Sequence, residues 1–142
     1  SMHDQARPGF IDLMASVGFL LLRWGMLEEV VRASIQRLAS MESRPAIADF
    51  SLWAELQREA RPYTEDQVRQ IESALDPLRQ LRNLIAHSMI GASADYEKHS
   101  EPTLRCVDRD DNLHFITLSE IQRAIRTLEG LCPRIEALGS AG

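Results

Sequence analysis

Apolar residues recur at helical spacing over the first third of the chain. Between about Pro8 and Leu38 the spacings of three and four residues are those of one buried helix face. This stripe consists of Phe10, Leu13, Val17, Leu20, Trp24, Leu27, Val31, Ile35 and Leu38. A second apolar sector lies beside it and consists of Leu21, Leu22, Met26 and Val30. The pattern predicts one long first helix that is buried on more than one side.

Two further helices are predicted before residue 90. The polar segment 40–48, which contains Pro45, interrupts the first pattern, and Ser51 is the expected cap of a short helix that ends before Pro62. Thr64 to Gln67 has the form of a capping box and should start a second long helix, with Pro77 as a kink or a restart. Its predicted buried seam is Val68, Ile71, Leu75, Leu78, Ile85 and Met89.

The character of the sequence changes after Ile90. Residues 91–102 are small, polar and charged and are expected to form a mobile loop. Residues 103–107 and 113–117 alternate as two short strands around the turn 108–112. A last helix should begin near Ser119 with Thr117 as its cap, and Pro133 should bend or end it. The fold class predicted is mainly α: an antiparallel helical bundle of about four helices with a small β-hairpin before the last helix.

Length and composition predict one soluble domain. The chain has 142 residues, 44% of them hydrophobic and 26% charged, which is ordinary for a globular protein. We expect a single domain over residues 3–139, with Ser1-Met2 as an expression scar. The longest apolar run, Leu13 to Leu22, is too short for a bilayer, and two cysteines are too few for a disulfide framework. The expected location is therefore the cytoplasm, with no membrane contact.

Position 82 breaks the seam of the second long helix. Arg82 stands where an apolar residue is expected, and such a cation is costly unless an anionic group meets it. Glu28, close to Trp24 on the stripe of the first helix, is the favoured partner. Asn83 and His87 are one turn apart and share a face beside the seam. The residues alone leave two interpretations open: a structural ion pair of Arg82, or a functional cluster of Arg82, Asn83 and His87.

The segment Arg82-Asn83-Leu84-Ile85-Ala86-His87 resembles the Arg-(four to six residues)-His motif of the HEPN superfamily, in the form where Asn follows Arg. The segment 19–28 also resembles the first helix of bacterial HEPN proteins, with an aromatic residue followed by an acidic one. The resemblance implies a small helical bundle that works as a homodimer, with the motifs of two subunits facing one another across a cleft. It also implies a metal-independent ribonuclease of the toxin or defence type, often paired with a nucleotidyltransferase-type antitoxin.

The residue types of the motif fit that chemistry. RNA is cleaved without metal when its 2′-hydroxyl attacks the adjacent phosphorus, which requires a base, an acid and positive charge on the phosphate. His87 can transfer protons near neutral pH, Arg82 offers donors suited to phosphate oxygens, and Asn83 would orient His87 or hold a phosphate oxygen. The motif of one protomer contains a single histidine, so a homodimer would supply both acid and base.

Other features limit this prediction. The net charge of −5 argues against a general nucleic-acid coat, although it permits a local basic cleft for an RNA substrate. His99 and His114 have no companion at metal-ligand spacing, and the acidic run 108–111 is interpreted as a solvated turn, so no metal site and no cofactor are expected. The alternatives to an endoribonuclease are a non-catalytic HEPN-like module that binds a nucleotide or a partner protein, and a purely structural dimerisation bundle.

Overall fold

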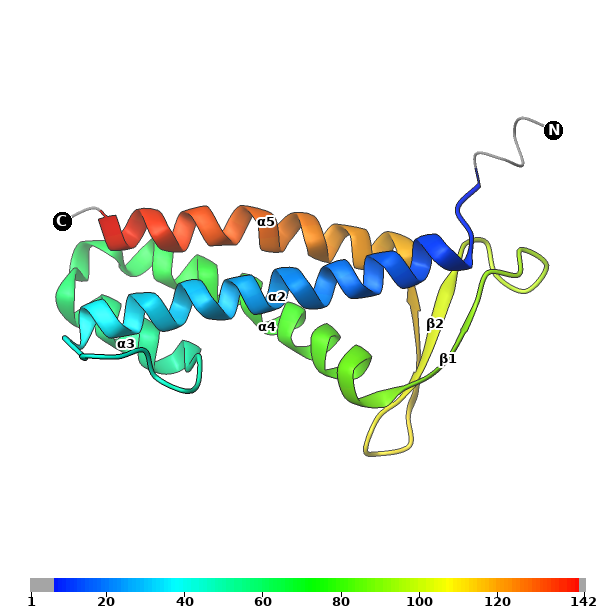
Figure 1. The fold of residues 1–142 in the computed structure, drawn as a ribbon, viewed down its shortest axis with the longest axis horizontal. Coiled ribbons are helices and arrows are strands. Elements are labelled where there is room, and N and C mark those ends of the chain that lie inside the picture. The colour runs from blue at the N-terminus through cyan, green and yellow to red at the C-terminus, as the bar shows by residue number, and fades with distance from the viewer. Residues whose placement is uncertain (1–6, 141–142) are drawn as a thin grey trace. The chain divides into compact units, whose positions relative to one another are not determined.

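The computed structural model describes residues 7–140, and this part of the chain is mainly α (Figure 1). Four α-helices are present among the described residues, as the pattern predicts, and the antiparallel sheet before the last helix has three strands, one more than the predicted hairpin. The elements in chain order are α2 (Phe10–Leu38), α3 (Phe50–Ala60), the short 3₁₀ helix η1 (Pro62–Thr64), α4 (Glu65–Ser88), β1 (Met89–Ser93), β2 (Thr103–Val107), β3 (Leu113–Thr117) and α5 (Leu118–Ser140).

The chain divides into two compact units. Among the described residues, one contains residues 7–22 and 80–125, and the other contains residues 23–79 and 126–140. The helices α2, α4 and α5 each contribute residues to both units. The expectation of one domain over residues 3–139 stays a prediction. The interpretation of Ser1-Met2 as an expression scar falls outside the described residues.

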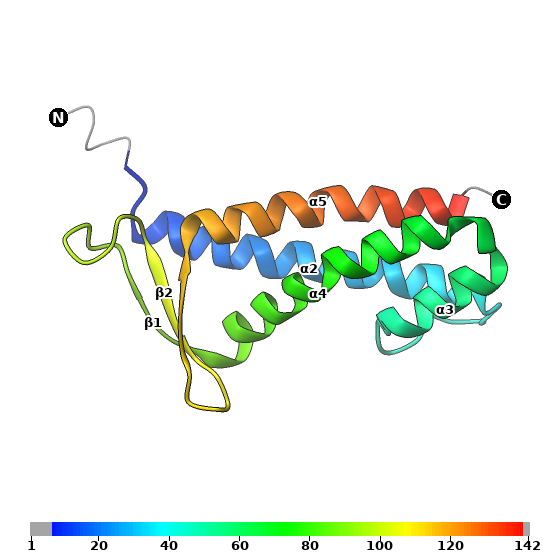
Figure 2. The ribbon, with the colours of Figure 1, turned by 180° about the vertical axis from the view of Figure 1, so that it is seen from behind.

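The first unit is built around the sheet, whose strand order is β1-β2-β3 (Figure 2). The hairpin of β2 and β3 has the predicted bounds and pairs Thr103 with Thr117 at its open end and Val107 with Leu113 at its turn. The turn is closed by the backbone N–H of Asp108, which donates to the carbonyl of Asn112 over 3.0 Å. The prediction of this hairpin is confirmed.

Strand β1 was not expected. Residues 91–93 belong to the segment 91–102, whose small, polar and charged residues predict a mobile loop. In the structure β1 follows α4 directly and pairs antiparallel with β2, with an irregularity in register between Met89 and Gly91. Backbone pairing with a neighbouring strand therefore overrides the weak local preference. Met89, expected in the helix seam, starts this strand and is 42% exposed.

The core of the first unit joins helix and sheet. Residues that alternate along the hairpin, Leu104, Cys106 and Ile116, are buried on one sheet face. Helix α5 begins directly after β3, and the Thr117 hydroxyl accepts a hydrogen bond from the backbone N–H of Glu120 over 3.2 Å. Thr117 therefore caps α5 as predicted. The other buried apolar residues of this unit are Leu13, Val17, Leu20, Ile85, Leu118, Ile121, Ala124 and Ile125.

The second unit contains helical segments of α2, α3, α4 and α5 around a buried polar contact. The indole N–H of Trp53 donates to the hydroxyl of Ser34 over 3.0 Å, and both side chains are buried. Asp49, and not Ser51, caps α3 by accepting from the backbone N–H of Leu52 over 3.0 Å. The cap prediction was wrong by two residues because Asp49 and Ser51 both have a side-chain oxygen that can accept such a hydrogen bond.

The start of α4 also differs from the prediction. The Thr64 hydroxyl donates to the carbonyl of Arg61 and accepts from the side chain of Gln57, so it is committed to the preceding turn and not to a capping box. Helix α4 continues past Pro77 and ends at Ser88, and α5 continues past Pro133. Of the two alternatives predicted for Pro133, a bend or an end of the helix, the end is therefore wrong.

The second apolar sector of α2 is exposed in the single chain. Leu22 is 58% and Met26 is 45% exposed, whereas the predicted stripe from Leu13 to Ile35 is buried. The expectation that α2 is buried on more than one side is therefore wrong for one copy of the chain. By length and composition alone, α2 could cross a membrane, which the shorter run Leu13 to Leu22 did not predict. The core helix of a soluble protein passes the same test.

Candidate functional site

The last turns of α4 carry the cluster that the sequence singled out. Asn83 and His87 are exposed on one face and line the same pocket. Arg82 is half-buried, and its guanidinium donates to the side-chain oxygen of Asn83 over 3.1 Å. Its Nε–H is buried with no hydrogen-bond partner among the described residues. Arg82 does not line the pocket itself but contacts a residue that does.

The pocket has a volume of about 560 Å³ and lies within the first unit, between the end of α4 and the hairpin. Its lining is mostly polar and includes imidazole, amide, hydroxyl, carboxylate and guanidinium groups, which suit a polar or anionic ligand. The residues from α4 are Gln80, Asn83, Leu84, His87 and Ser88, and those from the hairpin are Asp108, Arg109 and His114.

The hairpin side of the pocket is organised by the carboxylate of Asp108. One oxygen, Oδ2, is 2.7 Å from Nε2 of His114. The other, Oδ1, accepts from the backbone N–H groups of Asp110 and Asn112, both over 2.9 Å. The hydrogen bond with His114, followed by the backbone bond from Asn112, lowers the pKa of the Asp108 carboxyl from its ordinary 3.8 to about 2. Asp108 is therefore ionised at neutral pH.

Sequence reasoning missed His114, Asp108 and Arg109 as site residues. The sequence pattern predicts a solvated turn at 108–111, and His114 has no second potential metal ligand at a suitable spacing in the sequence. A signal was present in the hairpin pattern. His114 pairs with Cys106, and Asp108 follows Cys106 by two residues, so strand alternation places Asp108 and His114 on the same face. That this face meets the end of α4 is tertiary information.

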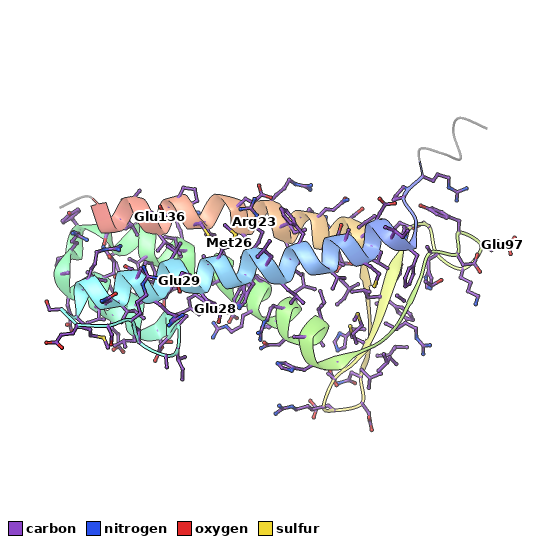
Figure 3. The ribbon with its side chains drawn as sticks, in the orientation of Figure 1. Arg23, Met26, Glu28, Glu29, Glu97 and Glu136 are labelled. Atoms are coloured by element: carbon purple, nitrogen blue, oxygen red, sulfur yellow. The ribbon has the colours of Figure 1, made fainter. Side chains whose placement is uncertain are left out.

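Glu28, the predicted partner of Arg82, belongs to the second unit. It lies on α2 next to Glu29 (Figure 3). Glu29 forms ion pairs with Arg32 and Arg44 in that unit. The pairing of Glu28 with Arg82 stays a prediction.

No group of three or more His, Cys, Asp or Glu side chains between residues 7 and 140 is arranged to hold a metal ion. Cys106 and Cys132 are free, and burial raises the pKa of both thiols. Neither cysteine lines the pocket at the end of α4.

Comparison with protein-family models, curated proteins and solved structures finds no match. The resemblance to the HEPN superfamily therefore rests on the residues of the segments 82–87 and 19–28 alone.

Proposed function

We propose that this chain is a metal-independent endoribonuclease of the HEPN type, with its site at the end of α4. The observation that supports this most is that Asn83 and His87 line one pocket together with Arg109. An imidazole, an amide and a guanidinium around a space of about 560 Å³ are suited to a phosphodiester and its attacking hydroxyl.

His87 supplies a group that transfers protons near neutral pH. Asn83 provides amide donors to a phosphate oxygen, and its own oxygen is held by Arg82 over 3.1 Å. We place Arg82 as the residue that fixes Asn83 and adds positive charge behind the pocket, in addition to the phosphate clamp that the resemblance implies. Arg109 brings a second guanidinium to the pocket from the hairpin turn. The guanidinium groups of Arg82 and Arg109 concentrate positive charge at the pocket. This local charge suits a polyanionic substrate although the net charge of the chain is −5.

The test is cleavage of a fluorescently labelled single-stranded RNA by the purified protein in the presence of a chelator. We expect products that end in a 2′,3′-cyclic phosphate, and no cleavage where the 2′-hydroxyl is replaced by hydrogen. His87→Ala should reduce the rate about a hundred- to ten-thousand-fold, which is the usual value of general acid–base catalysis. Arg82→Ala should cause a loss of similar order, and Asn83→Ala a smaller one.

His99→Ala is the matched control, because His99 lines a different hollow with Phe115 on the sheet and is absent from the pocket lining. It should cleave like the wild type. If the wild type leaves RNA intact over hours and matches His87→Ala, the enzyme proposal is wrong. The same pocket would then be titrated with a nucleotide to test the non-catalytic binding module.

A further inference from the structure

A second histidine of the same protomer lines the pocket that holds His87. We propose that His114 is the general acid of the reaction and His87 the general base, with Asp108 as the residue that positions His114. This inference rests on the proposed ribonuclease function and adds to it, because it places both proton-transfer groups in one protomer. A second subunit is then not needed to supply the acid.

The geometry distinguishes the two imidazoles. His114 is bonded through Nε2 to the carboxylate of Asp108, which leaves Nδ1 as the ring nitrogen available to a substrate. The carboxylate is itself fixed by two backbone N–H groups of the turn, so the ring is oriented before any ligand enters. The His114 side chain is 39% exposed and the Asp108 side chain 25%, so the pair is accessible from the pocket.

The assignment of roles follows from charge. The carboxylate among the lining residues belongs to Asp108 and lies 2.7 Å from Nε2 of His114, so the pocket's negative charge faces this ring, and we assign the proton-donor role to it. His87 has the amide of Asn83 beside it in the pocket, and no carboxylate lines the pocket from α4. The charged and titratable groups of the pocket are His87 from α4 and Asp108, Arg109 and His114 from the hairpin.

The reaction is balanced with these two groups alone. His87 takes the proton of the 2′-hydroxyl as the bond from O2′ to phosphorus forms. The bond from phosphorus to the 5′-oxygen breaks, and His114 gives its proton to that oxygen. The products are a 2′,3′-cyclic phosphate and a 5′-hydroxyl. Asn83 and Arg109 bind the phosphoryl oxygens, and Arg82 adds positive charge from behind Asn83, all without exchanging protons.

The test uses two RNA substrates that differ in one atom. In the second substrate a sulfur replaces the bridging 5′-oxygen, and this thiolate leaves without protonation. With the ordinary substrate, His114→Ala and His87→Ala should each lower the rate about a hundred- to ten-thousand-fold. With the sulfur substrate, His114→Ala should regain most of the wild-type rate, and His87→Ala should not.

Asp108→Asn tests the positioning role. It keeps hydrogen-bonding capacity in the turn but removes the charge, so it should lose less than His114→Ala and should also be rescued by the sulfur substrate. His99→Ala should behave as the wild type with both substrates. Circular dichroism of each variant verifies that it is folded.

Mixing tests whether one site needs His87 from both subunits. Wild type and His87→Ala are refolded together at fixed total concentration. With one His87 per site, as the proposal requires, the rate falls in proportion to the wild-type fraction. With a site composed of His87 from two subunits, it falls with the square of that fraction, and the one-protomer assignment is overturned.

The remaining outcomes separate the inference from the proposed function. Full activity of His114→Ala on the ordinary substrate overturns the role of His114 and leaves the ribonuclease proposal standing. Equal loss on both substrates overturns the general-acid role, and rescue of His87→Ala instead reverses the two roles. A wild type that cleaves neither substrate overturns the inference and the proposed function together.

Discussion

The carboxyl of Asp108 offers a direct measurement of how the hairpin side of the pocket is held. Its pKa in the folded protein is about 2, against an ordinary value of 3.8, and the hydrogen bond with His114 is the largest cause. His114→Ala removes that cause and leaves the backbone bonds from Asn112 and Asp110. The pKa of Asp108 should then rise part of the way back to 3.8.

The assay is the carboxyl carbon chemical shift of Asp108 in the NMR spectrum, followed from pH 6 downwards in the wild type and in His114→Ala. Asp110, an exposed residue of the same turn, provides the reference signal in both spectra. If Asp108 of the wild type titrates near 3.8, or if its midpoint is the same in both proteins, the hydrogen bond does not hold the carboxylate as described.

The sign of the linked stability follows from the lowered pKa. Asp108 binds its proton more weakly in the folded chain than in the unfolded chain, where its pKa has the ordinary value of 3.8. Its contribution is therefore fully present above the unfolded pKa and is lost as the pH falls through about 2. Between pH 4 and pH 2 the free energy of unfolding of the wild type should fall more steeply than that of His114→Ala.

Three further predictions concern other parts of the chain. Ser34→Ala leaves the buried indole N–H of Trp53 without its acceptor and should lower the free energy of unfolding by about 1–3 kcal/mol, measured by urea denaturation. Glu28→Ala should lower stability and also ribonuclease activity, because the predicted pairing with Arg82 would leave a half-buried charge without its partner. The chain should be a homodimer by light scattering at tens of micromolar, and Leu22→Asp in the exposed sector of α2 should shift it to monomer.

Matched controls accompany these variants. Ser51→Ala removes an exposed serine hydroxyl and should change stability little, so an equal loss would mean that the bond to Trp53 is not the cause. Glu42→Ala removes an exposed carboxylate and should change stability and activity little. If Glu28→Ala lowers them no more than Glu42→Ala does, the result argues against the pairing of Glu28 with Arg82. Ile47→Asp adds a charge at another exposed apolar residue and should leave the dimer intact. A wild-type monomer would contradict the dimer prediction outright.

The helices and the hairpin could be predicted because their periods are local properties. The stripe of α2 and the seam of α4 keep helical spacing over many turns, and residues 103–107 and 113–117 alternate around a polar turn. Strand β1 escaped prediction because its residues favour a loop and only the neighbouring strand β2 makes them a strand. The intrinsic preference of a segment determines its secondary structure only where no neighbouring strand is available to pair with it.

Some residues of the candidate site could be identified from the sequence, and others could not. Asn83 and His87 could be found from their spacing on one helix, which already places them on one face. His114 could not, because the hairpin that carries it meets the end of α4 only through the fold of the first unit. The sequence alone does not distinguish a site histidine such as His114 from an ordinary surface histidine, because the residues that surround it come from elsewhere in the chain.

The carboxylate of Asp108 binds both the backbone of the turn and the imidazole in the pocket. The length of the turn therefore determines how His114 is oriented. One oxygen closes the loop by accepting from Asp110 and Asn112, and the other reaches the imidazole. An insertion at 109–112 would release the first oxygen and leave the second without a fixed direction. A hairpin tip that looks like ordinary surface is therefore a poor place for an affinity tag, a fluorophore or a grafted peptide. The loop 39–49 offers an attachment point that touches none of these bonds.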